Sequence, residues 1–273
     1  MPLLAWIVLF TLLGGVLSVL AAALFLLTPD RHRSRLLPHG VSFALGALLS
    51  VAFIDLLPHA LESAGPAGSE SLFATVLTGI LSFFLLEKLL LWRHCHTSDC
   101  EAHFDMDEHF HQPAGTLIVV GDGIHNFVDG VLIAAAFLTD IHLGVVTALA
   151  VAAHEIPQEV GDFAILLQSG CTRSKALLFN MLSSLGTLIG GLLAYFSLES
   201  LHGALPYILA LAASSFIYVS VADLIPTLHK KTHPEAVVQQ MTLILAGVLL
   251  IATVHHYAHD FQPPVTREPV AHP

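Results

Sequence analysis

The chain has 273 residues, of which 55% are hydrophobic and 11% are charged, and its mean hydropathy is +0.77. This composition excludes an ordinary soluble domain and indicates an integral membrane protein in a lipid bilayer. The net charge is −11 and the ten Lys and Arg residues are scattered, so no nucleic-acid partner is expected. Three cysteines cannot build a disulfide framework, and we expect thiols on the reducing side.

Apolar runs long enough to cross a bilayer recur along the whole chain. The first has no cationic residue before it and is too long for a secretory signal, so we expect it to be retained. The sequence predicts an all-α integral membrane protein with eight transmembrane helices in a single domain, residues 1–273. The helices are expected at about residues 3–27, 36–61, 70–92, 114–138, 142–168, 174–198, 203–228 and 236–258.

The basic residues fall almost entirely on one side of such a topology. Eight crossings put nine of the ten on that side and leave only Arg267 on the other. The positive-inside rule then places both termini outside the cytoplasm. Residues 93–113 become a cytoplasmic loop rich in His and acidic residues, which either holds or senses metal or is a solvated charged loop.

A short internal repeat links the second and seventh predicted helices. Asp55-Leu-Leu-Pro58 in one matches Asp223-Leu-Ile-Pro226 in the other. These helices would run in opposite directions, so helices 1–3 and 6–8 form an inverted repeat around helices 4 and 5, a 3+2+3 arrangement typical of transporters. The alternative is a chance match of two apolar helices, in which the two Asp-Pro endings have structural roles.

Polar side chains are concentrated in the fourth and fifth predicted helices. His125 and Asp129 are four residues apart and share a helix face, and so do His154 and Gln158. Ionisable groups in a membrane interior are costly and mark functional sites. We therefore expect a metal site here, although interhelical hydrogen bonds without a ligand are the alternative. The candidate metal ligands are His125, Asn126, Asp129, His154, Glu155 and Gln158.

The ligand types narrow the choice of ion. Imidazoles, carboxylates and carboxamides together suit Zn²⁺, Fe²⁺ or Mn²⁺, and the lack of a thiolate argues against a structural zinc or a copper site. Pro157 interrupts the fifth helix, which spanning helices tolerate where the freed carbonyl lines a cavity. A labile site of this kind suits an ion that must be released.

An intramembrane zinc metalloprotease is one alternative, because His154-Glu155 begins a string like HExxH. Such a motif needs a second histidine four residues after the first, where this chain has Gln158. A non-transporting metal sensor is the other alternative. We expect neither, and therefore no enzyme.

Two segments of this chain together resemble the paired signature of the ZIP (Zrt/Irt-like) family of divalent-metal transporters. They are His125-Asn126-Phe-Val-Asp129-Gly130 and His154-Glu155-Ile-Pro157-Gln158-Glu159-Val-Gly-Asp162. The resemblance extends over the whole chain. It implies uptake of Zn²⁺, or of Fe²⁺, Mn²⁺ or Cd²⁺, toward the cytoplasm, with the ion as substrate and no prosthetic group. It also implies movement between two helix bundles, a homodimer and a bacterial-type inner membrane.

Carried over residue by residue, the resemblance places the six candidate ligands at the transport site, with an outer approach near His59 and Glu62. Two positions depart from the family pattern. Gln158 stands where relatives have His or Glu, and a carboxamide is the weaker ligand. The sixth helix offers Asn180 and serines where some bacterial members have a carboxylate for a second metal.

Overall fold

The computed structural model describes residues 2–94, 113–168, 170–198, 202–229 and 234–260. Within these ranges the regular structure is entirely helical, which confirms the all-α class. The His-rich loop, with Cys95 and Cys100, lies outside the described residues. The helices are α1 (Leu3–Gly14), α2 (Val16–Leu26), α3 (Asp30–Ser50), η1 (Val51–Leu56), α4 (Leu57–His94), α5 (Pro113–Thr139), α6 (Ile141–Gln168), α7 (Arg173–Leu198), η2 (His202–Ala204), α8 (Leu205–Val219), η3 (Ser220–Leu224), α9 (Ile225–His229) and α10 (Pro234–Asp260).

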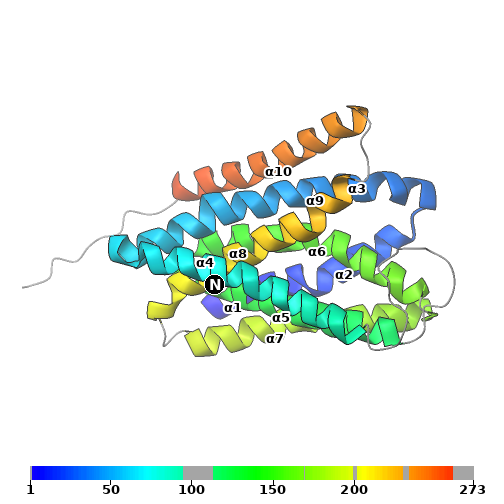
Figure 1. Ribbon diagram of the computed structural model, residues 1–273, viewed down its shortest axis with the longest axis horizontal. Coiled ribbons are helices and arrows are strands. Elements are labelled where there is room, and N and C mark those ends of the chain that lie inside the picture. The colour runs from blue at the N-terminus through cyan, green and yellow to red at the C-terminus, as the bar shows by residue number, and fades with distance from the viewer. Residues whose placement is uncertain (1, 95–112, 169, 199–201, 230–233, 261–273) are drawn as a thin grey trace, which may run out of the picture.

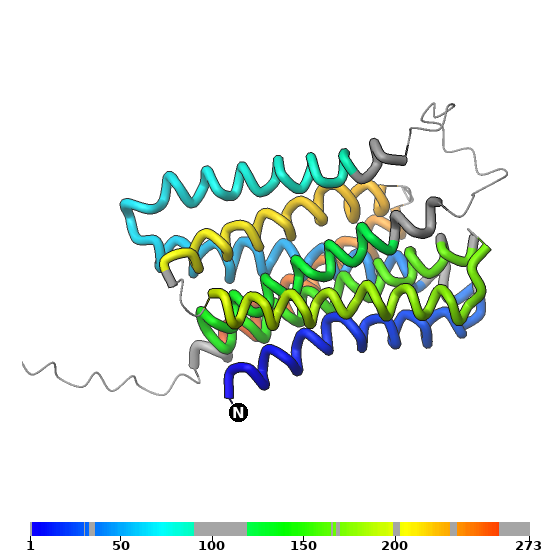
Figure 2. The backbone as a smooth tube through the Cα atoms, turned by 90° about the horizontal axis from the view of Figure 1, so that it is seen from below, coloured from blue at the N-terminus to red at the C-terminus, as the bar shows by residue number. Residues whose placement is uncertain are grey.

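Six segments of the described chain are long and apolar enough to cross a membrane. One of them, Leu36–Leu89, has 54 residues and contains a break at Gly65, whose φ of 66° and ψ of 176° are not helical. Glycine adopts this positive φ without a steric penalty. Figure 2 shows the chain turning back on itself within the cyan stretch of α4. The six do not include α6, which carries Glu155, Glu159 and Asp162 within its span, so the count of eight stays a prediction.

The helices lie side by side in an elongated bundle, with α10 along α3 at one edge and α7 at the opposite edge (Figure 1). α5 packs closely on α7. A Cβ atom on Gly130 would lie 1.9 Å from the Thr187 carbonyl oxygen, and one on Gly190 would lie 2.0 Å from the Phe127 carbonyl oxygen. Only glycine permits such close contact between backbones. α7 is thereby held directly against the part of α5 that carries the polar residues.

Both copies of the Asp-Leu-x-Pro repeat form a π-helical turn, η1 and η3. In each, the residue before the proline donates its N–H five residues back, from Leu57 to Ala52 and from Ile225 to Ser220. Proline has no N–H and cannot continue the regular i to i−4 ladder, so a wider turn before it is a local accommodation. The repeat is therefore shared in backbone conformation as well as in sequence.

Small residues fill the centre of the bundle. Its main core cluster includes Ala134, Ala135 and Ala136 of α5 and Ala148 and Ala150 of α6, all of them buried. Alanine lets helices approach closely inside a membrane, where packing rather than water exclusion drives association. The outer faces carry large apolar side chains, such as Val238 and Leu249 of α10, as a lipid-facing surface requires.

Candidate metal site

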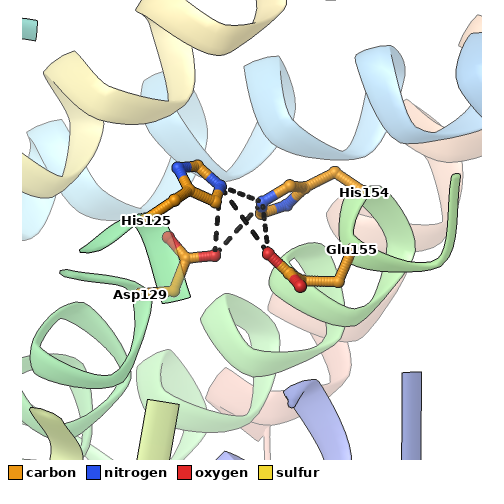
Figure 3. A group of neighbouring side chains, drawn as sticks. All are labelled: His125, Asp129, His154 and Glu155. Atoms are coloured by element: carbon orange, nitrogen blue, oxygen red, sulfur yellow. Dashed lines mark hydrogen bonds and ion pairs between the residues drawn. The ribbon is translucent and has the colours of Figure 1, made fainter. Parts of the chain in front are cut away.

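Four of the predicted ligands converge between α5 and α6. α5 contributes His125 and Asp129, and α6 contributes His154 and Glu155 (Figure 3). One ligand atom from each of the four lies within 4.8 Å of all the others. The i, i+4 spacing in α5 and the adjacent pair in α6 bring the four side chains to one point because the two helices are antiparallel neighbours joined through Asp140.

The ligand atoms of this cluster lie at short distances from one another. The two imidazole Nε2 atoms lie 3.3 Å apart. His154 Nε2 lies 3.1 Å from Asp129 Oδ2 and 3.7 Å from Glu155 Oε1. His125 Nε2 lies 3.8 Å from Asp129 Oδ2 and 3.6 Å from Glu155 Oε1. A tetrahedral zinc site with Zn–N and Zn–O distances of about 2.0–2.2 Å needs only a small contraction of this set.

The His154 ring is oriented by the backbone. Its Nδ1 lies 3.1 Å from the Ala150 carbonyl oxygen, which accepts hydrogen bonds only. Nδ1 therefore carries the proton of the neutral ring, and Nε2 presents its lone pair to the cluster. Metal-binding histidines are typically fixed in this way by a hydrogen bond from the other ring nitrogen.

The cluster brings two carboxylates together in a part of the bundle that is buried from solvent. Asp129 and Glu155 are 0% exposed, and their four carboxylate oxygens have no hydrogen-bond partner among the described residues. No Lys or Arg occurs anywhere from residue 113 to 168, so α5 and α6 carry no permanently cationic side chain. Uncompensated buried carboxylates are costly, and a divalent cation would supply the missing charge.

The other two predicted ligands make different contacts. Asn126 accepts a hydrogen bond from Thr187 Oγ1 at 2.7 Å and donates from Nδ2 to Asp122 Oδ1 at 3.0 Å. Gln158 Nε2 donates to the same Asp122 oxygen at 3.4 Å. Their hydrogen bonds go to Asp122 and Thr187 and not to the four-residue cluster. Both carboxamides thus orient a neighbouring carboxylate.

A second acidic group lies next to the first. This group consists of Asp122, Glu155 and Glu159. All three residues are buried, and one carboxylate oxygen from each lies within 4.8 Å of the other two. Asp122 and Glu159 were not among the predicted ligands. The spacing alone contained the signal, because Glu159 comes one turn after Glu155 and Asp122 one turn before Asn126.

A cavity of about 740 Å³ reaches the cluster from one side. His125, His154 and Asp122 line its inner wall, and Glu87, hydrogen-bonded by the Tyr218 hydroxyl, lies on another wall. Its remaining lining includes Pro38 near the start of α3, Leu228 in α9 and Gln240 near the start of α10. The cavity therefore extends toward the end of the bundle where α3 and α10 begin.

The aspartates of the two repeat copies, Asp55 and Asp223, lie outside the four-residue cluster. Asp55 is 2% exposed, and its carboxylate accepts a hydrogen bond from His255 Nδ1 of α10, while its carbonyl contacts His59 Nδ1 at 2.8 Å. Asp223, its counterpart in the repeat, lines the cavity. The two copies of the repeat thus place their aspartates in different surroundings.

The helical bundle and the cluster of imidazoles and carboxylates in its apolar interior define a multi-pass integral membrane protein with a candidate site for a divalent cation. Residues 93–255 match the model of the ZIP zinc transporter family. The chain belongs to this family, whose members are transporters and not enzymes.

Curated relatives carry matching names. The chain is 33% identical over 223 residues to zinc transporter ZIP13 of Pongo abelii, covering 77% of this chain and 64% of that protein. It is 30% identical over 258 residues to ZIP13 of Danio rerio, covering 78% and 74%. It is 29% identical over 339 aligned positions to zinc transporter SLC39A7 of Rattus norvegicus, covering 89% and 71%.

Proposed function

We propose that this protein transports divalent metal ions, with Zn²⁺ as the principal substrate, through a site between α5 and α6. The observation that carries the proposal is the convergence of His125, Asp129, His154 and Glu155 on one point in the bundle interior. A mixed set of imidazole and carboxylate ligands without a thiolate suits Zn²⁺ and also accommodates Fe²⁺, Mn²⁺ or Cd²⁺. The family and the names of the relatives support zinc.

We assign Asn126 and Gln158 to the same site as orienting residues. Each donates a hydrogen bond to Asp122 beside the cluster. Outer partners of this kind set ligand orientation and typically change metal affinity about 10–100-fold when removed. A rearrangement of either carboxamide toward the ion would make it a direct ligand.

The proposed direction is toward the cytoplasm by alternating access. The cavity joins the cluster to the end of the bundle where α3 and α10 begin, which is the end that the positive-inside rule assigns to the cytoplasm. This arrangement corresponds to a state open to the inside. On the outer side, ions would approach past His59 and Glu62 and reach the cluster when the cavity closes.

The proposed topology has eight crossings in a 3+2+3 order, with both termini outside. The break at Gly65 divides Leu36–Leu89 into two limbs, and the polar α6 is the further crossing that hydropathy does not detect. The paired π-helical turns η1 and η3 support the inverted repeat. A homodimer and a bacterial-type inner membrane stay predictions, and the relatives reported above are animal proteins.

The two alternatives make different demands on the site. A metalloprotease needs a glutamate that is free to poise a water, whereas Glu155 is buried and its Oε1 lies 3.6 and 3.7 Å from the two imidazoles, in the position of a ligand. A sensor would bind the ion without releasing it across the bundle. The cavity on one side of the cluster favours transport.

The test is Zn²⁺ uptake into proteoliposomes that contain a fluorescent chelator. Wild type should give saturable influx, and Asp129→Ala should abolish it, because Asp129 Oδ2 lies 3.1 Å from His154 Nε2 and 3.8 Å from His125 Nε2 within the cluster. Competition by Mn²⁺, Fe²⁺ and Cd²⁺ then ranks the substrates. Metal binding without influx in the wild type would contradict transport and favour a sensor, and cleavage of a membrane substrate that Glu155→Gln abolishes would favour a protease.

A further inference from the structure

We propose that Asp55 and His255 form a cation-contacting pair on the outer approach to the metal site, closed in this structure and exposed when the bundle opens outward. This pair deepens the proposed function, on which the inference rests, by naming outer side chains that a divalent cation meets before it reaches the cluster. The basis is a constant sequence spacing between the two halves of the chain. It relates Asp55 and His255 to residues on the wall of the cavity.

One spacing of 168 residues relates the two pairs. Asp223 comes 168 residues after Asp55, and the π-helical turns that contain them overlap at the same spacing. His255 likewise comes 168 residues after Glu87. The carboxylate of Asp55 contacts His255, and Asp223 lines the cavity together with Glu87. The Asp55–His255 pair is therefore the repeat counterpart of the Asp223–Glu87 pair.

The packing of the surrounding helices follows the same spacing. A Cβ atom on Gly79 of α4 would lie 2.0 Å from Ser214 Oγ of α8. A Cβ atom on Gly247 of α10 would lie 3.2 Å from the Gly46 carbonyl carbon of α3. Gly247 comes 168 residues after Gly79, and Ser214 comes 168 residues after Gly46. The α4–α8 and α10–α3 contacts are thus equivalent close approaches at small residues.

The two sides differ in whether the wall is open. Asp223 is exposed on the cavity wall, whereas Asp55 is 2% exposed. The neighbouring cavity-lining residues also have buried counterparts, namely Ser50, Val51 and Leu56 for Tyr218, Val219 and Leu224. The outer counterpart of the cavity wall is therefore packed shut in this structure. A transporter built from inverted repeats exchanges these two conditions during alternating access.

The side chains of the outer wall suit an entering Zn²⁺. A carboxylate and an imidazole are both ligands of this ion. His59 adds a second imidazole, and its Nδ1 lies 2.8 Å from the Asp55 carbonyl oxygen. The counterparts of the two histidines on the inner wall are Glu87 and Thr227, which offer oxygen only. Imidazoles favour Zn²⁺ over harder ions, so the outer approach has the more zinc-selective chemistry.

Outward opening is tested by the reactivity of an introduced cysteine. Ser50→Cys puts a thiol of similar size at a residue that is 3% exposed here and whose counterpart, Tyr218, lines the cavity. In intact cells that express the full chain, a membrane-impermeant thiol reagent should label this variant above the wild-type background. Ala52→Cys is the control, because Ala52 is 0% exposed and its counterpart, Ser220, does not line the cavity. No labelling of Ser50→Cys, or equal labelling of both variants, would overturn the proposal.

The ion contact is tested by the concentration dependence of Zn²⁺ uptake. Asp55→Asn should raise KM about tenfold with little change in Vmax, because an acidic wall raises the local concentration of cations. His255→Glu recreates the acidic pair of the inner wall and should keep KM near the wild-type value. Glu70→Gln is the control and should also keep it, since Glu70 is an exposed carboxylate of α4 whose counterpart, Val238, does not line the cavity.

An unchanged KM in Asp55→Asn would overturn the proposal, and so would a lower Vmax at unchanged KM, which indicates a purely structural contact. If Asp55→Asn does not reach the membrane, His255→Gln gives the same test, with a raised KM expected. Saturable wild-type uptake with an unchanged KM in the variant would leave transport standing and remove only the outer pair. No uptake by the wild type would contradict the proposed function itself.

Discussion

His125 and His154 face each other across the α5–α6 interface with their Nε2 atoms 3.3 Å apart. The His154 Nε2 is a lone-pair acceptor because its Nδ1 donates to the Ala150 carbonyl. An ion between the rings would bind both Nε2 atoms. Without an ion, the two Nε2 atoms can share only one proton between them. This facing pair is the most direct structural reason to place the ion here.

Replacing either histidine of this pair should weaken Zn²⁺ binding. We expect His125→Ala and His154→Ala to lower affinity by more than the roughly 10–100-fold typical of an outer-shell partner, because each removes a direct ligand. Isothermal titration of the purified protein measures the change. His142→Ala is the matched control, since His142 lies in α6 outside the cluster and should retain wild-type affinity. Equal affinities in all four proteins would contradict the site.

Thr187→Val should lower stability through Asn126. It removes the hydroxyl that donates to Asn126 Oδ1 at 2.7 Å and leaves that buried oxygen unpaired, which costs about 1–3 kcal/mol. Thermal unfolding in detergent measures the loss. Thr147→Val is the control, because the buried Thr147 hydroxyl has no hydrogen-bond partner among the described residues and its removal should be neutral or stabilising. The reverse order of the two variants would contradict the contact.

Gly130→Ala should disrupt the packing of α5 on α7. The added Cβ would lie 1.9 Å from the Thr187 carbonyl oxygen, and overpacking of this kind typically costs about 1–3 kcal/mol. Gly123→Ala in the same helix meets nothing closer than 3.8 Å and should gain up to about 1 kcal/mol from helix propensity. Melting temperatures of the two variants should therefore move in opposite directions. A matching shift for both would show that the close approach of α5 and α7 is not maintained.

Zn²⁺ affinity should fall as pH is lowered. The ligands bind metal as neutral imidazoles and ionised carboxylates, so protons compete with the ion and binding releases protons. Titrations in buffers of different ionisation enthalpy at neutral and mildly acidic pH measure both the affinity and the number of protons released. Affinity that rises on acidification would contradict an imidazole and carboxylate site.

Much of the architecture follows from local sequence. The apolar composition and the absence of strand patterns lead to an all-helical membrane protein, and the spacing of His125 and Asp129 places them on one face of α5. The paired motif identifies the family. These features depend only on residues close together in the chain.

The hydrogen-bond partners of Asn126 and Gln158 depend on how α5, α6 and α7 pack together. Spacing puts Gln158 on the same face as His154, yet its hydrogen bond goes to Asp122 of α5. Asn126 is held by Thr187, 61 residues away on α7. The close approach of α5 and α7 at Gly130 decides this contact, and no periodicity within one helix reveals it.

The conformation of the π-helical turns is also not determined by the local sequence alone. Pro58 and Pro226 predict a local interruption of the helix. The sequence does not say which one, because a kink, a helix end and a wide turn can each accommodate a residue without an N–H. In the structure both repeats form the wide turn. The surroundings of Asp55 and Asp223 then differ, because Asp55 contacts His255 of α10 whereas Asp223 lines the cavity.

The most direct test of the central claim is zinc X-ray absorption of the full chain loaded with less than one Zn²⁺ per chain. The site predicts two imidazole nitrogens and two carboxylate oxygens at about 2.0–2.2 Å, with no sulfur. Asp129→Ala should remove one oxygen and keep both imidazoles. A spectrum with sulfur ligands, or one without imidazole scattering, would place the ion elsewhere and contradict the account.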